Sequence, residues 1–158
     1  MFKSKLMLAS AGVFLLAGCQ SHNTLEAKNK ALVKRYVDEI LNGDDLSTAH
    51  EIIAPDYTFY RNGKEVPEKG VDVFKAEEDE IEQYSSMVMT DEKMIAEGNT
   101  VAVRWHQTAT LKPEDSEHHS STKRITWYGM SFYTIENGLM VEGRIIDVAE
   151  LYKDSESR

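Results

Sequence analysis

Residues 100–111 read TVAVRWHQTATL, a segment in which apolar and polar side chains alternate. A repeat of two residues is the period of a β-strand, whose successive side chains point to opposite faces of a sheet. The apolar positions on one face are Val101, Val103, Trp105, Ala109 and Leu111. The segment therefore predicts a strand with one face in the core and a polar face opposite.

The segments on either side predict that this strand belongs to an antiparallel meander. Glu97-Gly98-Asn99 is a turn signal before it, and Glu136-Asn137-Gly138 is a hairpin signal further along the chain. Residues 124–135 are apolar on both faces, which is typical of a central strand that is covered twice. Residues 139–149 would return as the last strand, and the polar residues 112–122 would form a loop.

The first part of the chain has the period of a helix. Apolar residues between Leu25 and Leu41 recur at helical spacing, which predicts one long helix with a single apolar face. Asn23 and Glu26 resemble a capping box that would begin this helix, and Asn42-Gly43 would end it.

Two shorter helices and one strand are expected next. One helix covers residues 46–53 and stops before a proline. Residues 57–61 then extend as a strand into Asn62-Gly63, a strong hairpin signal. The third helix covers residues 71–84, and the acidic run at residues 77–80 forms its solvent-exposed face.

Helices followed by a meander predict an α+β fold, with three N-terminal helices packed on one face of a strongly curved antiparallel sheet. These helices can cover only one face of the strand at residues 124–135. We therefore expect a homodimer through the sheet, in which a second copy covers the other face.

The composition limits the classes of function. The chain has 158 residues, with 18 Lys and Arg against 27 Asp and Glu, and a net charge of −9. This length suits one domain, and an acidic chain lacks the basic surface that nucleic acids require. The adjacent His118 and His119 lack the spacing of zinc ligands. We therefore expect no metal, no cofactor and no nucleic-acid partner.

The N-terminus has the features of a secretory signal. Two lysines precede the run from Leu6 to Ala17, which contains only apolar and small residues. This run is shorter than the about 18 apolar residues of a transmembrane helix. Leu16-Ala17-Gly18-Cys19 resembles the bacterial lipobox. The resemblance implies cleavage before Cys19, attachment of acyl chains such as palmitate at this cysteine, and anchoring in a membrane.

The expected organisation is a lipoprotein signal peptide over residues 1–18, an acylated tether over 19–24, one domain over 25–152 and a polar tail over 153–158. In enterobacteria an Asp after the cysteine favours inner-membrane retention, whereas this chain has Gln20. We expect secretion across the inner membrane and anchoring on the periplasmic side of the outer membrane. In an organism without an outer membrane, the domain would lie on the outer cell surface.

Several strings resemble the SnoaL-like family, the polyketide-cyclase-like members of the nuclear transport factor two-like superfamily, in the family's order from about Leu25 to Tyr152. They are NKALVKRY at 29–36, IAPDY at 53–57, IAEGNTVAVRW at 95–105, ITWYG at 125–129 and IENGLMVE at 135–142. The resemblance implies a cone, in which a bent sheet wraps the long helix and leaves an apolar pocket open at one end. The superfamily contains cyclases, isomerases, hydratases, epoxide hydrolases and non-catalytic binders, so the fold does not select a function.

Aromatic and polar residues along the expected elements are candidates for lining this pocket. The candidates are Tyr36, Trp105, Trp127, Phe132 and Arg144. Two alternatives remain open: the aromatic side chains would instead fill the cone as its core, and Arg144 would instead form a cross-strand ion pair.

Asp147 is the candidate for acid–base chemistry. Strand alternation places it with Val141, Ile145 and Ala149, facing the interior, where desolvation would suit a carboxyl to proton transfer. Catalytic SnoaL-like cyclases carry an acid–base Asp near the end of this strand, and Asp147 falls about one residue short of that spacing. A slip of one residue reverses the face unless a bulge absorbs it. The alternative is an Asp that faces solvent at the strand end.

The expected proton carriers are missing. Cyclase relatives commonly have a histidine where this chain has Tyr60, and often another where it has Leu111. We therefore predict binding of a small apolar ligand without catalysis. The alternative is a cyclase, isomerase or hydrolase that uses Asp147 as general acid or base, helped by Tyr60 or Arg144.

Overall fold

The computed structural model describes residues 17–76, 83–112 and 124–152, with side chains from Thr24 to Val148 within these ranges. Several expected features lie outside the described residues. They are the signal peptide up to residue 16, the acidic run at 77–80, the loop from residue 113 onward and the tail at 153–158.

Helices precede a long meander, as the α+β class requires. The described elements are α1 (Ala17–Arg35), a π-helical segment η1 (Tyr36–Leu41), α2 (Leu46–Ile52), β1 (Ile53–Arg61), β2 (Lys64–Glu65), α3 (Asp72–Ala76), β3 (Tyr84–Glu97), β4 (Thr100–Leu111), β5 (Arg124–Glu136) and β6 (Leu139–Tyr152).

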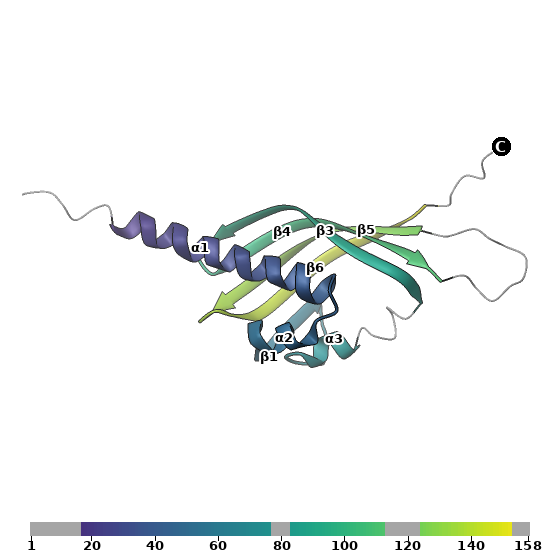
Figure 1. Cartoon of the computed structure of the whole chain (residues 1–158), viewed down its shortest axis with the longest axis horizontal. Helices are drawn as coiled ribbons and strands as arrows, with labels where there is room; N and C mark the ends of the chain where they lie inside the picture. The colour runs from purple at the N-terminus through teal and green to yellow at the C-terminus, as the bar shows by residue number, and fades with distance from the viewer. Residues whose placement is uncertain (1–16, 77–82, 113–123, 153–158) are drawn as a thin grey trace, which may run out of the picture.

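The strands form one curved sheet of six strands in the order β2-β1-β6-β5-β4-β3 (Figure 1). The predicted antiparallel meander is confirmed for β3 to β6. β1 runs parallel to β6, with Arg61 level with Ile145, so the expectation of a wholly antiparallel sheet is wrong. The hydrophobic pattern of a strand determines which face it buries, whereas its direction depends on a partner that lies much later in this chain.

The sheet has two different ends. At the turn end, β3 joins β4 through Gly98, and β5 joins β6 through Asn137-Gly138. At the open end, Tyr84 of β3 pairs with Leu111 of β4. α1 crosses one face of the sheet (Figure 1) and is fastened near the turn end, where Asn29 Nδ2 donates to the Gly98 carbonyl at 2.9 Å.

The long helix differs from its prediction at the start. α1 is already helical at Ala17, the first described residue, so the capping box predicted at Asn23 lies inside the helix and does not begin it. The predicted end is confirmed, because η1 stops at Leu41. The side-chain amide of Asn42 then exchanges two hydrogen bonds of 2.8 Å with the backbone of Met89 in β3.

Tyr84 also differs from its prediction. α3 is described over Asp72–Ala76, and Tyr84 is the first residue of β3 rather than part of a helix. Its ring meets that of Trp127 edge to face, with 5.7 Å between the ring centroids. This contact joins residues far apart in the chain, which a local helical period cannot reveal.

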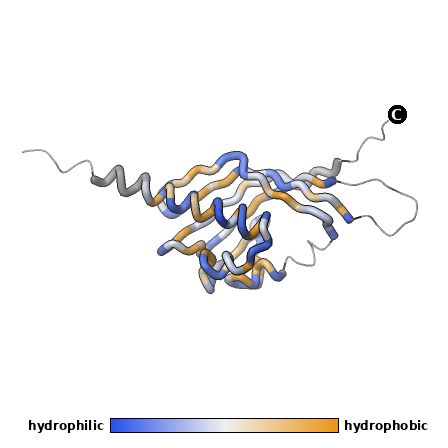
Figure 2. The backbone as a smooth tube through the Cα atoms, in the orientation of Figure 1, coloured by the Kyte–Doolittle hydropathy of each residue, from blue (hydrophilic) through white to orange (hydrophobic). Residues whose placement is uncertain are grey.

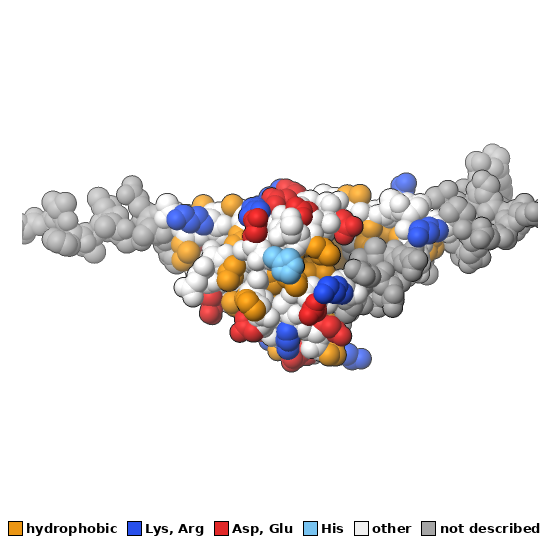
Figure 3. Space-filling view, turned by 60° about the horizontal axis from the view of Figure 1, so that its bottom comes forward, with side chains coloured by type: hydrophobic (Ala, Val, Ile, Leu, Met, Phe, Trp, Pro, Cys, Tyr) orange, Lys and Arg blue, Asp and Glu red, His pale blue; other side chains and the backbone are white. Residues whose placement is uncertain are grey.

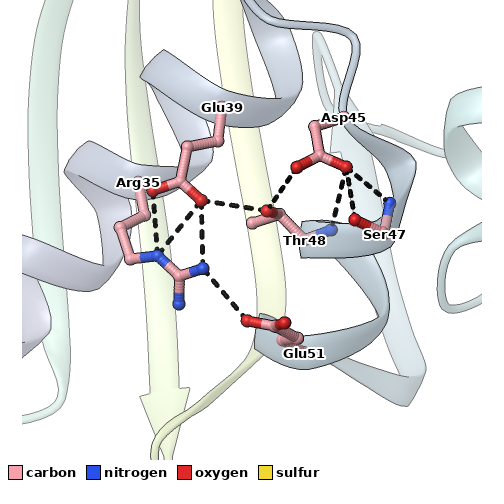
Figure 4. A network of polar contacts seen from close by, with 6 residues as sticks. All are labelled: Arg35, Glu39, Asp45, Ser47, Thr48 and Glu51. Atoms are coloured by element: carbon pink, nitrogen blue, oxygen red, sulfur yellow. Dashed lines mark hydrogen bonds and ion pairs between the residues drawn. The ribbon is translucent and has the colours of Figure 1, made fainter.

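Polar side chains join α2 to the end of the long helix (Figure 4). Asp45 caps α2 by accepting hydrogen bonds from the backbone N–H groups of Ser47 and Thr48 at 3.0 and 3.4 Å. Hydrogen bonds from Ser47 and Thr48 also lower the pKa of the Asp45 carboxyl. The Thr48 hydroxyl donates to Glu39 at 2.9 Å, and Glu39 pairs with Arg35 at 3.0 Å. These contacts hold the helices together.

The core lies between the helices and the inner face of the sheet, which we define as the face toward α1. The alternation predicted for β4 is confirmed, because Val101, Val103, Trp105 and Ala109 are at most 3% exposed. Figure 2 shows hydrophobic segments recurring along α1 and the strands. The interior is therefore built from the apolar positions that the helical period of α1 and the two-residue period of the strands indicate.

The outer face of the sheet, opposite α1, carries large apolar side chains that are 41–65% exposed. We call this set the outer patch: Val88, Ile95, Tyr128, Met130, Phe132, Ile146 and Val148. The side of α2 and α3 is different, because acidic, basic and apolar side chains are intermixed there (Figure 3).

Candidate binding site around Asp147

Asp147 faces the inside of the sheet because β6 contains a bulge. Thr134 pairs with Glu142 and Ile135 pairs with Met140, so Val141 between them is an extra residue. The bulge shifts the alternation by one position. Simple alternation predicted that Val141 and Asp147 share one register. The bulge at Val141 shows that they do not. The side chain of Asp147 is only 8% exposed.

Two neighbours in β1 and its turn hold the Asp147 carboxylate. Arg61 Nη2 lies 3.2 Å from Oδ2, and Asn62 Nδ2 donates to Oδ1 at 2.8 Å. Asn62 Oδ1 in turn accepts from the Asp147 backbone N–H at 3.1 Å. We call these three residues the Asp147 cluster.

The local sequence explains how Arg61 and Asn62 reach this place. Tyr57 and Phe59 are buried on the inner face of β1, and Arg61 follows two residues later on the same face. Asn62 adopts a positive φ of 51°, which Asn tolerates better than most residues. β1 ends there, so the Asn62 side chain folds over the edge of β6.

The roles of Arg61 and Asn62 were not apparent from the sequence. Alternation from Tyr57 and Phe59 was a signal that placed Arg61 inside. The pairing with Asp147 had no local signal, because Asn62 and Asp147 are 85 residues apart. Only the parallel pairing of β1 with β6 brings them together.

The cluster restricts what Asp147 can do chemically. A general acid or base must present a carboxyl oxygen to a substrate proton. Here each oxygen already accepts a hydrogen bond from a protein donor. Among the described histidines, His106 lies beside Glu92 with 3.1 Å between Nδ1 and Oε1, and His50 is exposed on α2. Neither is bonded to the carboxylate, which Arg61 and Asn62 hold in one orientation.

Two predicted lining residues belong to the core. Tyr36 is 3% exposed, and its ring centroid lies 5.3 Å from that of Tyr133. Trp105 is also 3% exposed, and its Nε1 donates to the Ser131 hydroxyl at 2.7 Å. Both side chains fill the interior, which is the alternative that the sequence left open.

Three other candidates lie on the outer face, so they cannot share a cavity with Asp147. Phe132 is half-exposed in the outer patch and is level with Arg144. The Arg144 guanidinium lies 4.0 Å from the centre of the Tyr60 ring and pairs with Glu142 at 2.7 Å. The structure therefore places Phe132 and Arg144 away from the inner face, because each lies an odd number of positions from an inward-facing residue of its own strand.

Trp127 is the predicted lining residue that remains both on the inner face and accessible. It is half-buried and pairs with Ala149, two residues beyond Asp147. Gln107, also half-buried, pairs with Trp127 from β4. With Tyr84 against it, Trp127 provides an aromatic surface between the Asp147 cluster and the open end.

A separate hollow of about 400 Å³ lies at the turn end. It is lined by Leu25, Asn29, Asn99, Ile135, Glu136, Asn137 and Gly138. Within the described ranges, no group of three or more His, Cys, Asp or Glu side chains is arranged to hold a metal ion.

The sequence profile of the SnoaL-like domain matches residues 33–143, and the chain belongs to this family. AclR from Streptomyces galilaeus, a proposed hydroxylase, is 26% identical with a TM-score of 0.62, over 79% of this chain and 90% of that one. A proposed SnoaL-like polyketide cyclase from Jannaschia is 18% identical with a TM-score of 0.65, over 78% and 87%. An epoxide hydrolase of the LEH-like type from M. tuberculosis is 11% identical with a TM-score of 0.61, over 78% and 84%.

No curated protein matches the sequence. The structural relatives share the α+β fold with its curved mixed sheet, and their assigned chemistries differ from one another. The family therefore defines the scaffold, and the function has to be argued from the site.

Proposed function

We propose that this chain is a lipid-anchored protein of the cell envelope, whose SnoaL-like domain binds a small apolar molecule on its inner face without catalysing a reaction. The observation that carries the proposal is the Asp147 cluster, in which a nearly buried carboxylate is held by Arg61 and Asn62. Trp127 and Tyr84 offer aromatic contact beside it. An apolar surface with one oriented acceptor is typical of a binding site.

The proposal is tested by what the protein retains on purification. Full-length protein from cell membranes, extracted in mild detergent, is expected to carry a small molecule detectable by mass spectrometry. Trp127→Ala removes the aromatic surface, and Asn62→Gly releases the carboxylate while still accepting the positive φ. Each should lower the bound amount at least about fivefold. The control Leu46→Ala, at an exposed position on α2, should retain it, and equal loss in all three variants would contradict the proposed site.

An enzyme that uses Asp147 as general acid or base is the second candidate. A buried carboxylate beside an arginine, in a fold that also hosts an epoxide hydrolase, favours it. The two functions separate when the recovered molecule is incubated with fresh protein. Binding alone predicts no conversion, whereas conversion that disappears in Asp147→Asn would establish the enzyme.

The membrane anchor rests on the lipobox resemblance at Cys19. Within the described residues, no helix is long and apolar enough to cross a membrane. An anchor of this type carries two or more acyl chains, because one chain binds a membrane only marginally. The domain would then lie on the periplasmic side of the outer membrane, or on the outer cell surface where no outer membrane exists.

Cys19→Ala is expected to abolish acylation and to leave less than about a tenth of the mature protein with the membrane fraction. The measurement is cell fractionation together with the mass of the purified protein, which reports the lipid directly. Ser21→Ala, two residues away in the tether, is the control and should be acylated normally. Full acylation of the Cys19 variant would contradict the anchor.

The proposed homodimer uses the outer patch, since large side chains there are exposed on a sheet face that no described helix covers. Ile146→Glu, at 65% exposure, should convert the lipid-free domain from dimer to monomer in light scattering. Leu46→Glu alters an apolar residue on α2 that is 37% exposed and should leave the dimer intact. A monomeric wild-type domain would remove this part of the proposal.

A further inference from the structure

Very little chain separates Cys19 from the folded domain. Glu26 already contacts the sheet, because its Oε1 accepts from the Gly98 N–H at 3.4 Å, and Asn29 is bonded to the same turn. Cys19 precedes Glu26 by seven positions, and the backbone of α1 is helical throughout this interval. A helix of that length spans about 10 Å, and even a fully extended chain spans at most about 25 Å.

The turn end is therefore the part of the domain nearest to the anchor. It contains the turn at Gly98-Asn99 and the turn at Asn137-Gly138, with the hollow of about 400 Å³ between them and α1. The lining of this hollow is mixed, because Asn29 and Glu136 lie beside Leu25. A mixed polar surface suits contact with hydrated lipid headgroups better than insertion among the acyl chains.

α1 leads away from the anchor toward the Asp147 cluster. Lys34 Nζ lies 3.3 Å from Asp91 Oδ1. Asp91 is level with Asp147 across the sheet, because Asp91 pairs with Trp105, Trp105 with Gly129 and Gly129 with Asp147. The helical rise places Lys34 about 22 Å from Cys19 along the axis. The open end of the sheet lies further away still.

We propose that the domain stands on the membrane with its turn end against the lipid headgroups, so that the Asp147 cluster and the open end face the aqueous space. This orientation rests on the proposed acylation of Cys19 and adds the direction in which the site opens. A ligand would then reach the inner face from the water and not directly from the bilayer.

Two fluorescent probes on the same strand test this orientation. Because Cys19 would be acylated, a cysteine introduced elsewhere would be the single free thiol of the mature chain. Glu97→Cys labels the turn end of β3, and Ser85→Cys labels its open end, about 40 Å away. Each labelled full-length lipoprotein is placed in vesicles of phosphatidylethanolamine and phosphatidylglycerol that carry a headgroup nitroxide, which quenches only at short range.

The probe at residue 97 is expected to be quenched at least about threefold more than the probe at residue 85. Equal quenching, or stronger quenching at residue 85, would overturn the orientation. Flotation with the vesicles reports the anchor separately, so protein that fails to float contradicts the acylation and not the geometry.

A longer tether provides the matched control. Insertion of ten Gly and Ser residues after Thr24 should leave flotation unchanged and remove the difference between the two probes, because a flexible linker releases the domain. A difference that persists would show that the tether does not set the orientation, which would also overturn the proposal.

Discussion

Gly143→Ala is expected to lower the free energy of unfolding by about 3 kcal/mol, at the upper end of the usual cost of overpacking a core. A methyl group at this position would lie 2.0 Å from the Tyr57 hydroxyl oxygen and 3.2 Å from Phe59 Cδ2. Tyr57 is fully buried, so its ring cannot move aside without disturbing β1. Because β1 carries Arg61, the same change should loosen the Asp147 cluster. Urea-induced unfolding measures the effect.

A double-mutant cycle with Tyr57→Phe separates this clash from a general loss of packing. Removing the hydroxyl leaves the nearest ring atom 3.0 Å from the new methyl group, so the clash should be relieved in part. The loss of unfolding free energy in the double variant should therefore be smaller than the sum of the losses in the two single variants, by about 1 kcal/mol or more. Strict additivity would show that Gly143 does not meet Tyr57.

Trp105→Ala is expected to cost about 3–5 kcal/mol of stability, the usual range for deleting a buried large aromatic side chain. The ring is 3% exposed and lies over Gly129, where an added methyl group would come within 2.3 Å of Trp105 Cζ2. Loss of the ring leaves a cavity beneath the middle of the sheet. It also leaves the fully buried Ser131 hydroxyl without its hydrogen-bond donor. Thermal or urea unfolding measures the change.

The hydrogen bond and the packing of Trp105 can be told apart. Trp105→Phe retains much of the ring and leaves Ser131 without its donor, which should cost about 1–3 kcal/mol. Adding Ser131→Ala removes the orphaned hydroxyl and should recover part of that loss. A double variant less stable than Trp105→Phe alone would contradict the role given to this bond.

Local patterns predicted much of the architecture because each reports which face of an element is buried. The alternation from Val101 to Ala109 in β4 and the turn at Asn137-Gly138 are both present in the structure. Helix starts were less predictable. The capping residues at Asn23 and Glu26 do not begin α1, because the helix continues through them from Ala17.

The candidate site was predicted only in part. Trp127 and Asp147 lie on the inner face, whereas Tyr60, Phe132 and Arg144 point outward. Simple alternation separates Trp127 from Phe132 in β5 and Arg144 from Asp147 in β6, whereas the bulge at Val141 decides which face of β6 carries Asp147. A bulge depends on how two strands fit together, so its position cannot be read from the period of one strand.

The amino-acid sequence by itself determined the α+β class, the meander and the buried face of β4, since these depend on periods that extend over a few neighbouring residues. Only the tertiary structure decided that β1 runs parallel to β6 and that Arg61 and Asn62 hold Asp147. The physical reason is distance along the chain: a hydrogen bond between residues 85 positions apart exists only after the strands between them have been placed.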